Sequence, residues 1–151
     1  MSRDEQVFFD PGDTTLGEAG RRVAQALGVG YEVHEEAVTL VTTVESQGEQ
    51  VDVHGTVETN IFSDSEPQSI EEEQIFDDMP YVLQLRTRKR QSEHQEAVAW
   101  KLYLALVSSL QWRSALTGEF SLLFAAYDAD RGLRTFPRGT LSEGRDAHIW
   151  R

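Results

Sequence analysis

The spacing of apolar side chains changes along the first half of the chain, and each spacing predicts one kind of element. Over residues 15–27 apolar side chains recur at helical spacing, behind a Thr15-x-x-Glu18 capping box and ahead of Gly28, which suits the position just past a helix end. From Tyr31 onward the apolar side chains alternate, as they do in strands with one face toward a core. We therefore expect a helix followed by two paired strands, with a turn at residues 45–49.

The second half repeats this change of period. Alternation over residues 81–85 predicts a strand, and the strongest helix pattern of the chain then runs from Ser92, with a Ser92-x-x-Gln95 capping box, to about Arg113. Its middle turns are apolar nearly all round, so we expect this helix to be buried against a sheet. Alternation over residues 120–136, on both sides of an Asp- and Gly-containing turn, predicts a closing hairpin.

These elements predict an α+β fold with the order β-α-β-β-β-α-β-β, in which one antiparallel sheet carries two main helices on one face. The apolar run at residues 7–9 fits an edge strand or an entry segment. Residues 63–79 form a long acidic connection, and residues 137–151 form an irregular tail whose Ile149 and Trp150 could dock on the body. A chain of 151 residues, 39% hydrophobic, is sufficient for a single domain over residues 1–151.

Negative charge is concentrated in the middle of the chain. The formal net charge is −12, and residues 23–85 contain fourteen Asp or Glu and no Lys or Arg. Residues 1–22, 23–85 and 86–151 carry −2, −14 and +4. Phosphates would be repelled over nearly half of the chain, so we expect no nucleic-acid ligand and favour a basic partner. A simpler interpretation is that the acidic residues only keep the protein soluble.

Most catalytic and cofactor-binding chemistry finds no support in the sequence. The chain has no cysteine, no pair of histidines with metal-ligand spacing and no glycine-rich phosphate loop, so we expect no metal, nucleotide or redox cofactor and no enzyme activity. His54 shares a predicted strand face with Asp52 and Glu58, which could form a carboxylate-imidazole site. A solvated sheet face explains these three residues more simply.

Two acidic features remain as candidate partner-binding surfaces. One is the exposed strand face, and the other is the acidic connection, where apolar side chains such as Phe62 and Phe76 stand among carboxylates and could anchor a partner. In the alternative interpretation these apolar side chains tether the connection to the core. The candidate residues are Asp52, His54, Glu58, Asp64, Glu66, Glu71, Glu72, Glu73, Phe76, Asp77 and Asp78.

As an order of elements, the chain resembles the small immunity proteins of bacterial polymorphic toxin systems, of the swarming-inhibition type. The resemblance rests on the first helix ending in Ala26-Leu27-Gly28, the β-rich middle, the apolar helix over 96–110 and the closing hairpin over 120–136. It implies a cytoplasmic inhibitor that binds and neutralises one toxin domain. The acidic connection departs from the pattern, so no binding residue is carried over.

Two other functions stay open at this point. The chain also resembles acidic type III secretion chaperones, which usually dimerise, and the group of His54 with Asp52 and Glu58 leaves an enzyme as a third interpretation. No apolar run is long enough to cross a membrane, and the N-terminus has no leader-like pattern, so we expect a cytoplasmic protein, monomeric or dimeric, with no membrane partner.

Overall fold

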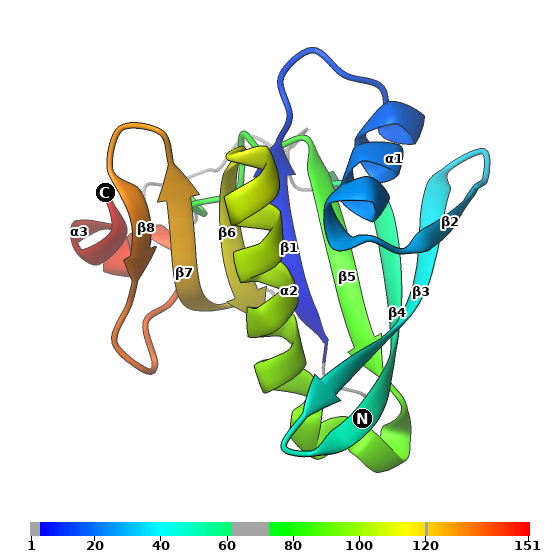
Figure 1. The fold of residues 1–151 in the computed structure, drawn as a ribbon. Coiled ribbons are helices and arrows are strands. Elements are labelled where there is room, and N and C mark those ends of the chain that lie inside the picture. The colour runs from blue at the N-terminus through cyan, green and yellow to red at the C-terminus, as the bar shows by residue number, and fades with distance from the viewer. Residues whose placement is uncertain (1–3, 62–72, 120) are drawn as a thin grey trace.

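The computed structural model of the protein describes residues 4–61, 73–119 and 121–151. Within these residues eight strands form one antiparallel sheet, in the order β2-β3-β4-β5-β1-β6-β7-β8 (Figure 1). The strands are β1 (Glu5–Asp10), β2 (Gly30–Val33), β3 (Ala37–Ser46), β4 (Glu49–Thr59), β5 (Tyr81–Thr87), β6 (Arg113–Gly118), β7 (Leu122–Asp128) and β8 (Gly132–Thr135). The helices are α1 (Leu16–Leu27), η3 (Lys89–His94), α2 (Gln95–Leu110), η4 (Gly144–Asp146) and α3 (Ala147–Trp150).

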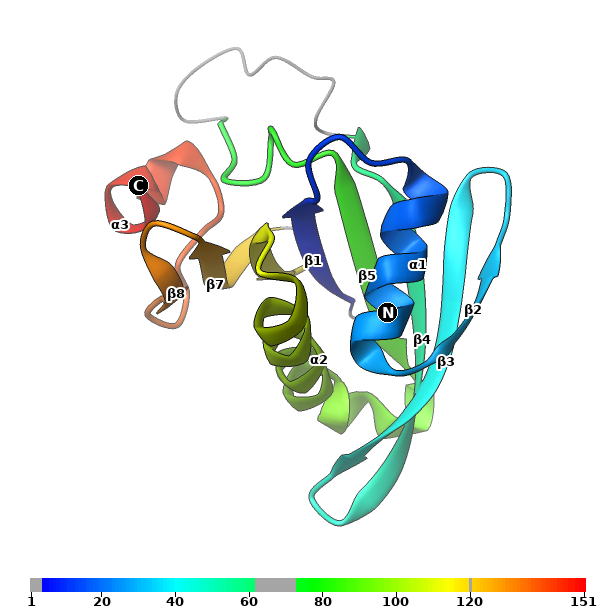
Figure 2. The ribbon, with the colours of Figure 1, turned by 45° about the horizontal axis from the view of Figure 1, so that its top comes forward.

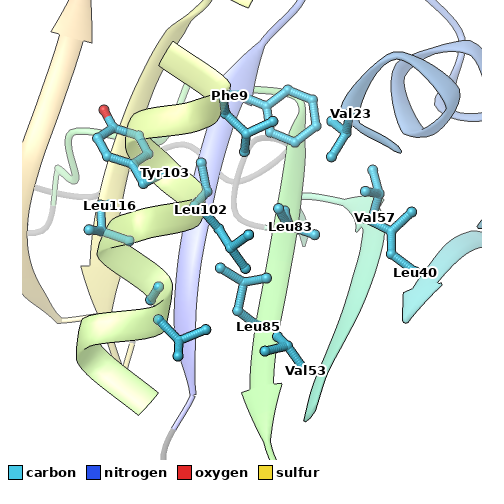
Figure 3. Packing of buried hydrophobic residues seen from close by; sticks show 14 of the residues in the cluster. Phe9, Val23, Leu40, Val53, Val57, Leu83, Leu85, Leu102, Tyr103 and Leu116 are labelled. Atoms are coloured by element: carbon cyan, nitrogen blue, oxygen red, sulfur yellow. The ribbon is translucent and has the colours of Figure 1, made fainter. Parts of the chain in front are cut away.

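The sheet and its two main helices confirm the predicted α+β class. Both α1 and α2 lie on the same side of the sheet (Figures 1 and 2). The apolar positions of the alternating strands point toward these helices and form the larger core, in which Phe9, Leu83 and Leu102 come from three different elements (Figure 3). The change between helical spacing and alternation in the sequence therefore correctly separates helices from strands.

Helix α1 begins and ends as the sequence predicts. The Thr15 hydroxyl accepts a hydrogen bond from the Glu18 backbone N–H at 3.2 Å, and Gly28 takes the left-handed conformation with φ 69° just after the last helical residue. Gly20 lies where the helix meets β3, and a Cβ added to it would lie 2.5 Å from Val38 Cβ. The small residue thus permits a close helix–sheet contact.

Helix α2 differs from the prediction at both ends. The Ser92-x-x-Gln95 capping box is wrong, because Ser92 lies inside η3 and the helix begins at Gln95, whose side-chain amide donates to the Leu85 carbonyl and accepts from Thr87. The helix ends at Leu110, where Gln111 takes φ 54°, and Arg113 begins strand β6 rather than ending the helix. Strand β6 and the short strand β2 therefore extend the predicted order.

Strand β1 is central, which corrects its prediction as an edge strand or entry segment. It lies between β5 and β6, with Val7 opposite Leu83 on one side and Leu116 on the other. Its side chains are buried on both faces of the sheet, including the polar Glu5 and Gln6. A short apolar run with only three apolar residues thus forms the middle of the fold.

The described segments cover the second face of the sheet over only part of its width. Over β1, β6 and β7, residues of segment 74–79 and of the C-terminal segment form a smaller core with Phe8, Val82 and Ala115. The tail predicted to be irregular includes η4 and α3. Trp150 docks as anticipated, with 5% of its surface exposed, whereas Ile149 stays exposed. The rest of this face, over β2 to β5, carries mainly polar side chains.

Candidate functional site

The predicted strand-face residues lie on β4 but do not form one group. Asp52 pairs with Arg88 at 2.9 Å and accepts a hydrogen bond from the Thr43 hydroxyl at 3.3 Å. Glu58 accepts a hydrogen bond from the side-chain amide of Gln84. Exposed His54 makes no hydrogen bond or ion pair with Asp52 or Glu58 among the described residues. The three side chains therefore do not form a hydrogen-bonded carboxylate-imidazole group among the described residues.

A shallow hollow of about 230 Å³ surrounds His54, and it includes Glu58 but not Asp52. Across this hollow the guanidinium of Arg86 donates two hydrogen bonds to the Asp4 carboxylate, at 2.8 and 2.7 Å. These bonds raise the pKa of Arg86 above its ordinary value. The hollow thus contains a fixed cation beside its carboxylates, which weakens its attraction for a cationic ligand.

The described end of the acidic connection is neutralised by the chain's own basic residues. Asp78 pairs with Arg113 at 2.6 Å, and Glu73 pairs with Arg151. Asp77 accepts a hydrogen bond from the Gln74 backbone N–H at 2.9 Å; its burial raises its pKa, and this effect exceeds the lowering by that bond. Phe62, Asp64, Glu66, Glu71 and Glu72 lie outside the described residues.

Phe76 is a core residue and not an exposed anchor. Its side chain is fully buried and stacks on Phe8, with ring centroids 3.8 Å apart and planes 9° from parallel. The side-chain amide of Asn60 fixes the segment by donating to the carbonyls of Phe76 and Met79, at 2.9 and 2.8 Å. For Phe76 and Met79 the alternative interpretation, a tether to the core, is therefore the correct one.

A second acidic surface lies where the open and covered parts of the sheet face meet. It is a depression of about 620 Å³ whose rim carries Glu35, Glu36 and Glu58. Its apolar lining comes from Phe8, Leu16, Ile61 and Val82, and Ile61 has 74% of its surface exposed. No Lys or Arg lines it among the described residues. We call this surface the acidic depression.

Glu58 was predicted from the sequence as a partner-binding residue, whereas Glu35 and Glu36 of this surface were not. The hairpin register brings them together, because Ala37 lies opposite Glu58 in the β3–β4 pairing and the two glutamates precede Ala37 directly. The signal was present in the sequence as the two adjacent carboxylates directly before the predicted strand.

The comparisons with known proteins assign no family to the chain. No family model matches it, and neither a curated protein nor a solved structure does. Among the described residues, no helix is both long and apolar enough to cross a membrane. Any functional assignment therefore depends on the geometry of the surfaces described above.

One group among the described residues has donors spaced for a metal ion. Glu49, Glu93 and His94 each contribute a ligand atom, and these atoms lie within 4.8 Å of one another. Glu49 begins β4, whereas Glu93 and His94 end η3, so the group joins two segments far apart in the sequence. The search for histidine pairs in the sequence could not find it.

Another cavity holds balanced charges. It has a volume of about 340 Å³ and lies between segment 73–79, β7, β8 and the C-terminus. Arg113, Arg131 and Arg151 each pair with a carboxylate of the same lining. The fourth arginine of the lining, Arg134, lies 4.0 Å from the Asp128 carboxylate and donates to the Trp150 carbonyl at 2.9 Å. The lining therefore contains four arginines and four carboxylates, so its formal charges balance.

Proposed function

We propose that this protein is a non-enzymatic binding module whose acidic depression docks a basic segment of a protein partner. The observation that carries the proposal is the combination of three glutamates on the rim, exposed apolar surface within it and no cationic side chain in the described lining. Protein interfaces commonly combine an apolar centre with a polar rim. Lysine or arginine side chains of the partner would meet the rim, and their apolar neighbours would meet Ile61.

The ion pairs that the other candidate carboxylates form within the chain support the acidic depression as the docking site. Asp52, Glu73 and Asp78 already have arginine partners within the chain, so a basic ligand would have to displace those arginines. Glu35 and Glu36 form no ion pair with any described residue, and both are exposed. Their charges are therefore available to attract a basic partner and to raise its association rate.

A partner protein of different sequence fits this surface better than a second copy of the chain. Strand β2 is an edge strand with exposed Tyr31 and Val33, and edge strands can pair with other chains. Two copies paired through β2 would bring Glu32, Glu35 and Glu36 of both chains together, and like charges oppose such pairing. A basic partner has no such penalty.

The function we favour within this class is neutralisation of a basic toxin domain, as the resemblance to immunity proteins implies. A secretion chaperone would also bind a basic segment at an acidic surface, but it would hold that segment unfolded. The two differ in the state of the bound partner. Hydrogen exchange of the partner in the complex separates them, because a folded toxin domain keeps protected amides and a chaperone client does not.

The test compares two triple variants of equal charge change. The partner is captured from native extract, identified by mass spectrometry and purified, and its association rate is measured at several salt concentrations. We expect Glu35→Gln with Glu36→Gln and Glu58→Gln to slow association by about tenfold or more at low salt. The control, Asp13→Asn with Glu45→Gln and Asp130→Asn, changes exposed carboxylates outside the depression and should slow it far less. Equal effects of the two triples would refute the acidic depression as the docking site.

A further inference from the structure

We propose that Glu49, Glu93 and His94 form a binding site for a divalent transition-metal ion, with Zn²⁺ as the best-fitting ion. This inference is independent of the proposed function. The site lies at the end of the molecule where the β3–β4 turn meets η3 (Figures 1 and 2). One imidazole nitrogen and two carboxylates are ligands that zinc accepts, and water would complete the coordination.

His94 is held in the orientation that a metal ligand needs. Its side chain is only 4% exposed, and its Nδ1 lies 3.0 Å from the buried Ser46 hydroxyl. Its other nitrogen, Nε2, points to the carboxylates of Glu49 at 2.8 Å and Glu93 at 3.6 Å. Metal-binding histidines characteristically use their second ring nitrogen in a hydrogen bond of this kind, which fixes the ring and frees the other nitrogen for the metal.

The distances from His94 Nε2 to the two carboxylates are close to those of a zinc site, and the ligand atoms of the two glutamates lie within 4.8 Å of each other. With Zn–N and Zn–O bonds near 2.0–2.2 Å, ligand atoms at two corners of a tetrahedron lie about 3.3 Å apart. The Glu93 oxygen is already near this separation from His94 Nε2, and the Glu49 oxygen must move away by about 0.5 Å. Both glutamates are exposed, so their side chains can make this adjustment without disturbing the core.

The backbone under the site is fixed by other contacts. The side-chain amide of Gln91 donates to the Gln50 carbonyl at 3.1 Å and accepts from the Asp52 backbone N–H at 3.2 Å, which joins η3 to the start of β4. Gln47 and Gly48, both with positive φ, form the tight turn immediately before Glu49. The three donors are therefore positioned by rigid elements, as a binding site requires.

The two carboxylates of the cluster also favour a cation. Neither Glu49 nor Glu93 pairs with a lysine or arginine among the described residues, so His94 is their single ionisable partner there. A divalent ion would balance two carboxylates around a neutral imidazole. A protonated His94 would balance only one of them. The sequence predicts no metal site because no ligand set has suitable spacing, whereas this cluster draws its donors from two segments far apart in the chain.

The experiment measures Zn²⁺ binding to the untagged full chain by calorimetry and uses Co²⁺ absorption to report coordination. We expect one saturable site, with affinity lowered at least tenfold in Glu49→Gln and Glu93→Gln. Glutamine at position 49 can still accept a hydrogen bond from His94, so this variant removes the anionic ligand while keeping the structural contact. Glu45→Gln, in the same hairpin but outside the cluster, is the matched control and should bind as the wild type does.

A further variant tests the positioning of His94. Ser46→Ala leaves all three ligands in place but removes the partner of Nδ1, and we expect it to weaken Zn²⁺ binding by about 10–100-fold. The proposal is overturned if the wild type shows no saturable binding, or if Glu49→Gln and Glu93→Gln bind Zn²⁺ as tightly as Glu45→Gln. In either case the cluster is only a hydrogen-bonded contact between the hairpin and η3.

Discussion

The close contact between α1 and β3 makes the substitution Gly20→Ala a direct test of the fold. The added Cβ would lie 2.5 Å from Val38 Cβ and Cγ2, whereas carbon atoms in contact are normally about 3.5–4.0 Å apart. Because Val38 Cβ is itself one of the clashing atoms, no rotation of the Val38 side chain can relieve the clash. Either α1 or β3 must move by about 1 Å.

The expected magnitude follows from two opposing effects. Alanine improves the intrinsic stability of a helix over glycine by about 0.5–1 kcal/mol. Overpacking of a well-packed core costs about 1–3 kcal/mol. We therefore expect Gly20→Ala to lower the free energy of unfolding by about 1–2 kcal/mol, which corresponds to a fall in Tm of about 2–8 °C for a chain of this size.

Gly17 in the same helix provides the matched control. A Cβ at position 17 would have a single neighbour, Val33 Cγ1 at an ordinary 3.8 Å, so Gly17→Ala should stabilise the protein by about 0.5 kcal/mol. Urea unfolding followed by tryptophan fluorescence measures both variants. The double variant Gly20→Ala with Val38→Ala should not recover stability, because the Cβ–Cβ clash remains. A Gly20→Ala protein as stable as Gly17→Ala would show that α1 does not approach β3 as described.

Two further predictions concern segment 74–79. Phe76→Ala should lower the free energy of unfolding by about 3–5 kcal/mol, because it removes a fully buried aromatic ring, and Phe76→Leu should lower it by less. Denaturant unfolding measures both variants. Unchanged stability together with lost partner binding would instead support an exposed anchor. Asp77→Asn should stabilise the protein at neutral pH. Burial raises the pKa of Asp77, so the folded state loses stability as pH rises through that raised pKa, and asparagine does not carry this charge. Thermal unfolding should show this gain disappearing below the ordinary aspartate pKa of 3.8, where Asp77 is protonated in both states, and a gain independent of pH would contradict the burial argument.

The sequence predicted those elements whose patterns are local. Helix α1, the β3–β4 hairpin and the β7–β8 hairpin each have a clear period and a clear turn, and the structure confirms them. Strand β6 was missed because Arg113–Gly118 has no strong alternation and follows α2 after only two residues. No sequence signal predicted the helix end at Gln111, since a left-handed residue at a helix end is most often glycine.

The position of a strand within the sheet depends on partners distant in sequence, so β1 could not be placed at the centre from its own residues. The same limit applies to the acidic surfaces. Glu73 and Asp78 are neutralised by Arg151 and Arg113, and no periodicity connects residues so far apart. Composition could predict that the acidic segment and the basic C-terminal segment, residues 86–151, attract each other. Part of the basic partner expected for the acidic connection is therefore the chain itself.

The central position of β1 has a consequence for how the protein reaches its folded state. The strand is synthesised before both of its partners, because Phe8 pairs with Val82 in β5 and with Ala115 in β6. Contacts between residues far apart in sequence require costly loop closure and slow the folding of a domain. During synthesis the apolar run Val7-Phe8-Phe9 must therefore wait, unpaired, until most of the chain has left the ribosome. The interval before β6 emerges is the period in which this protein is most exposed to aggregation and has most need of a chaperone.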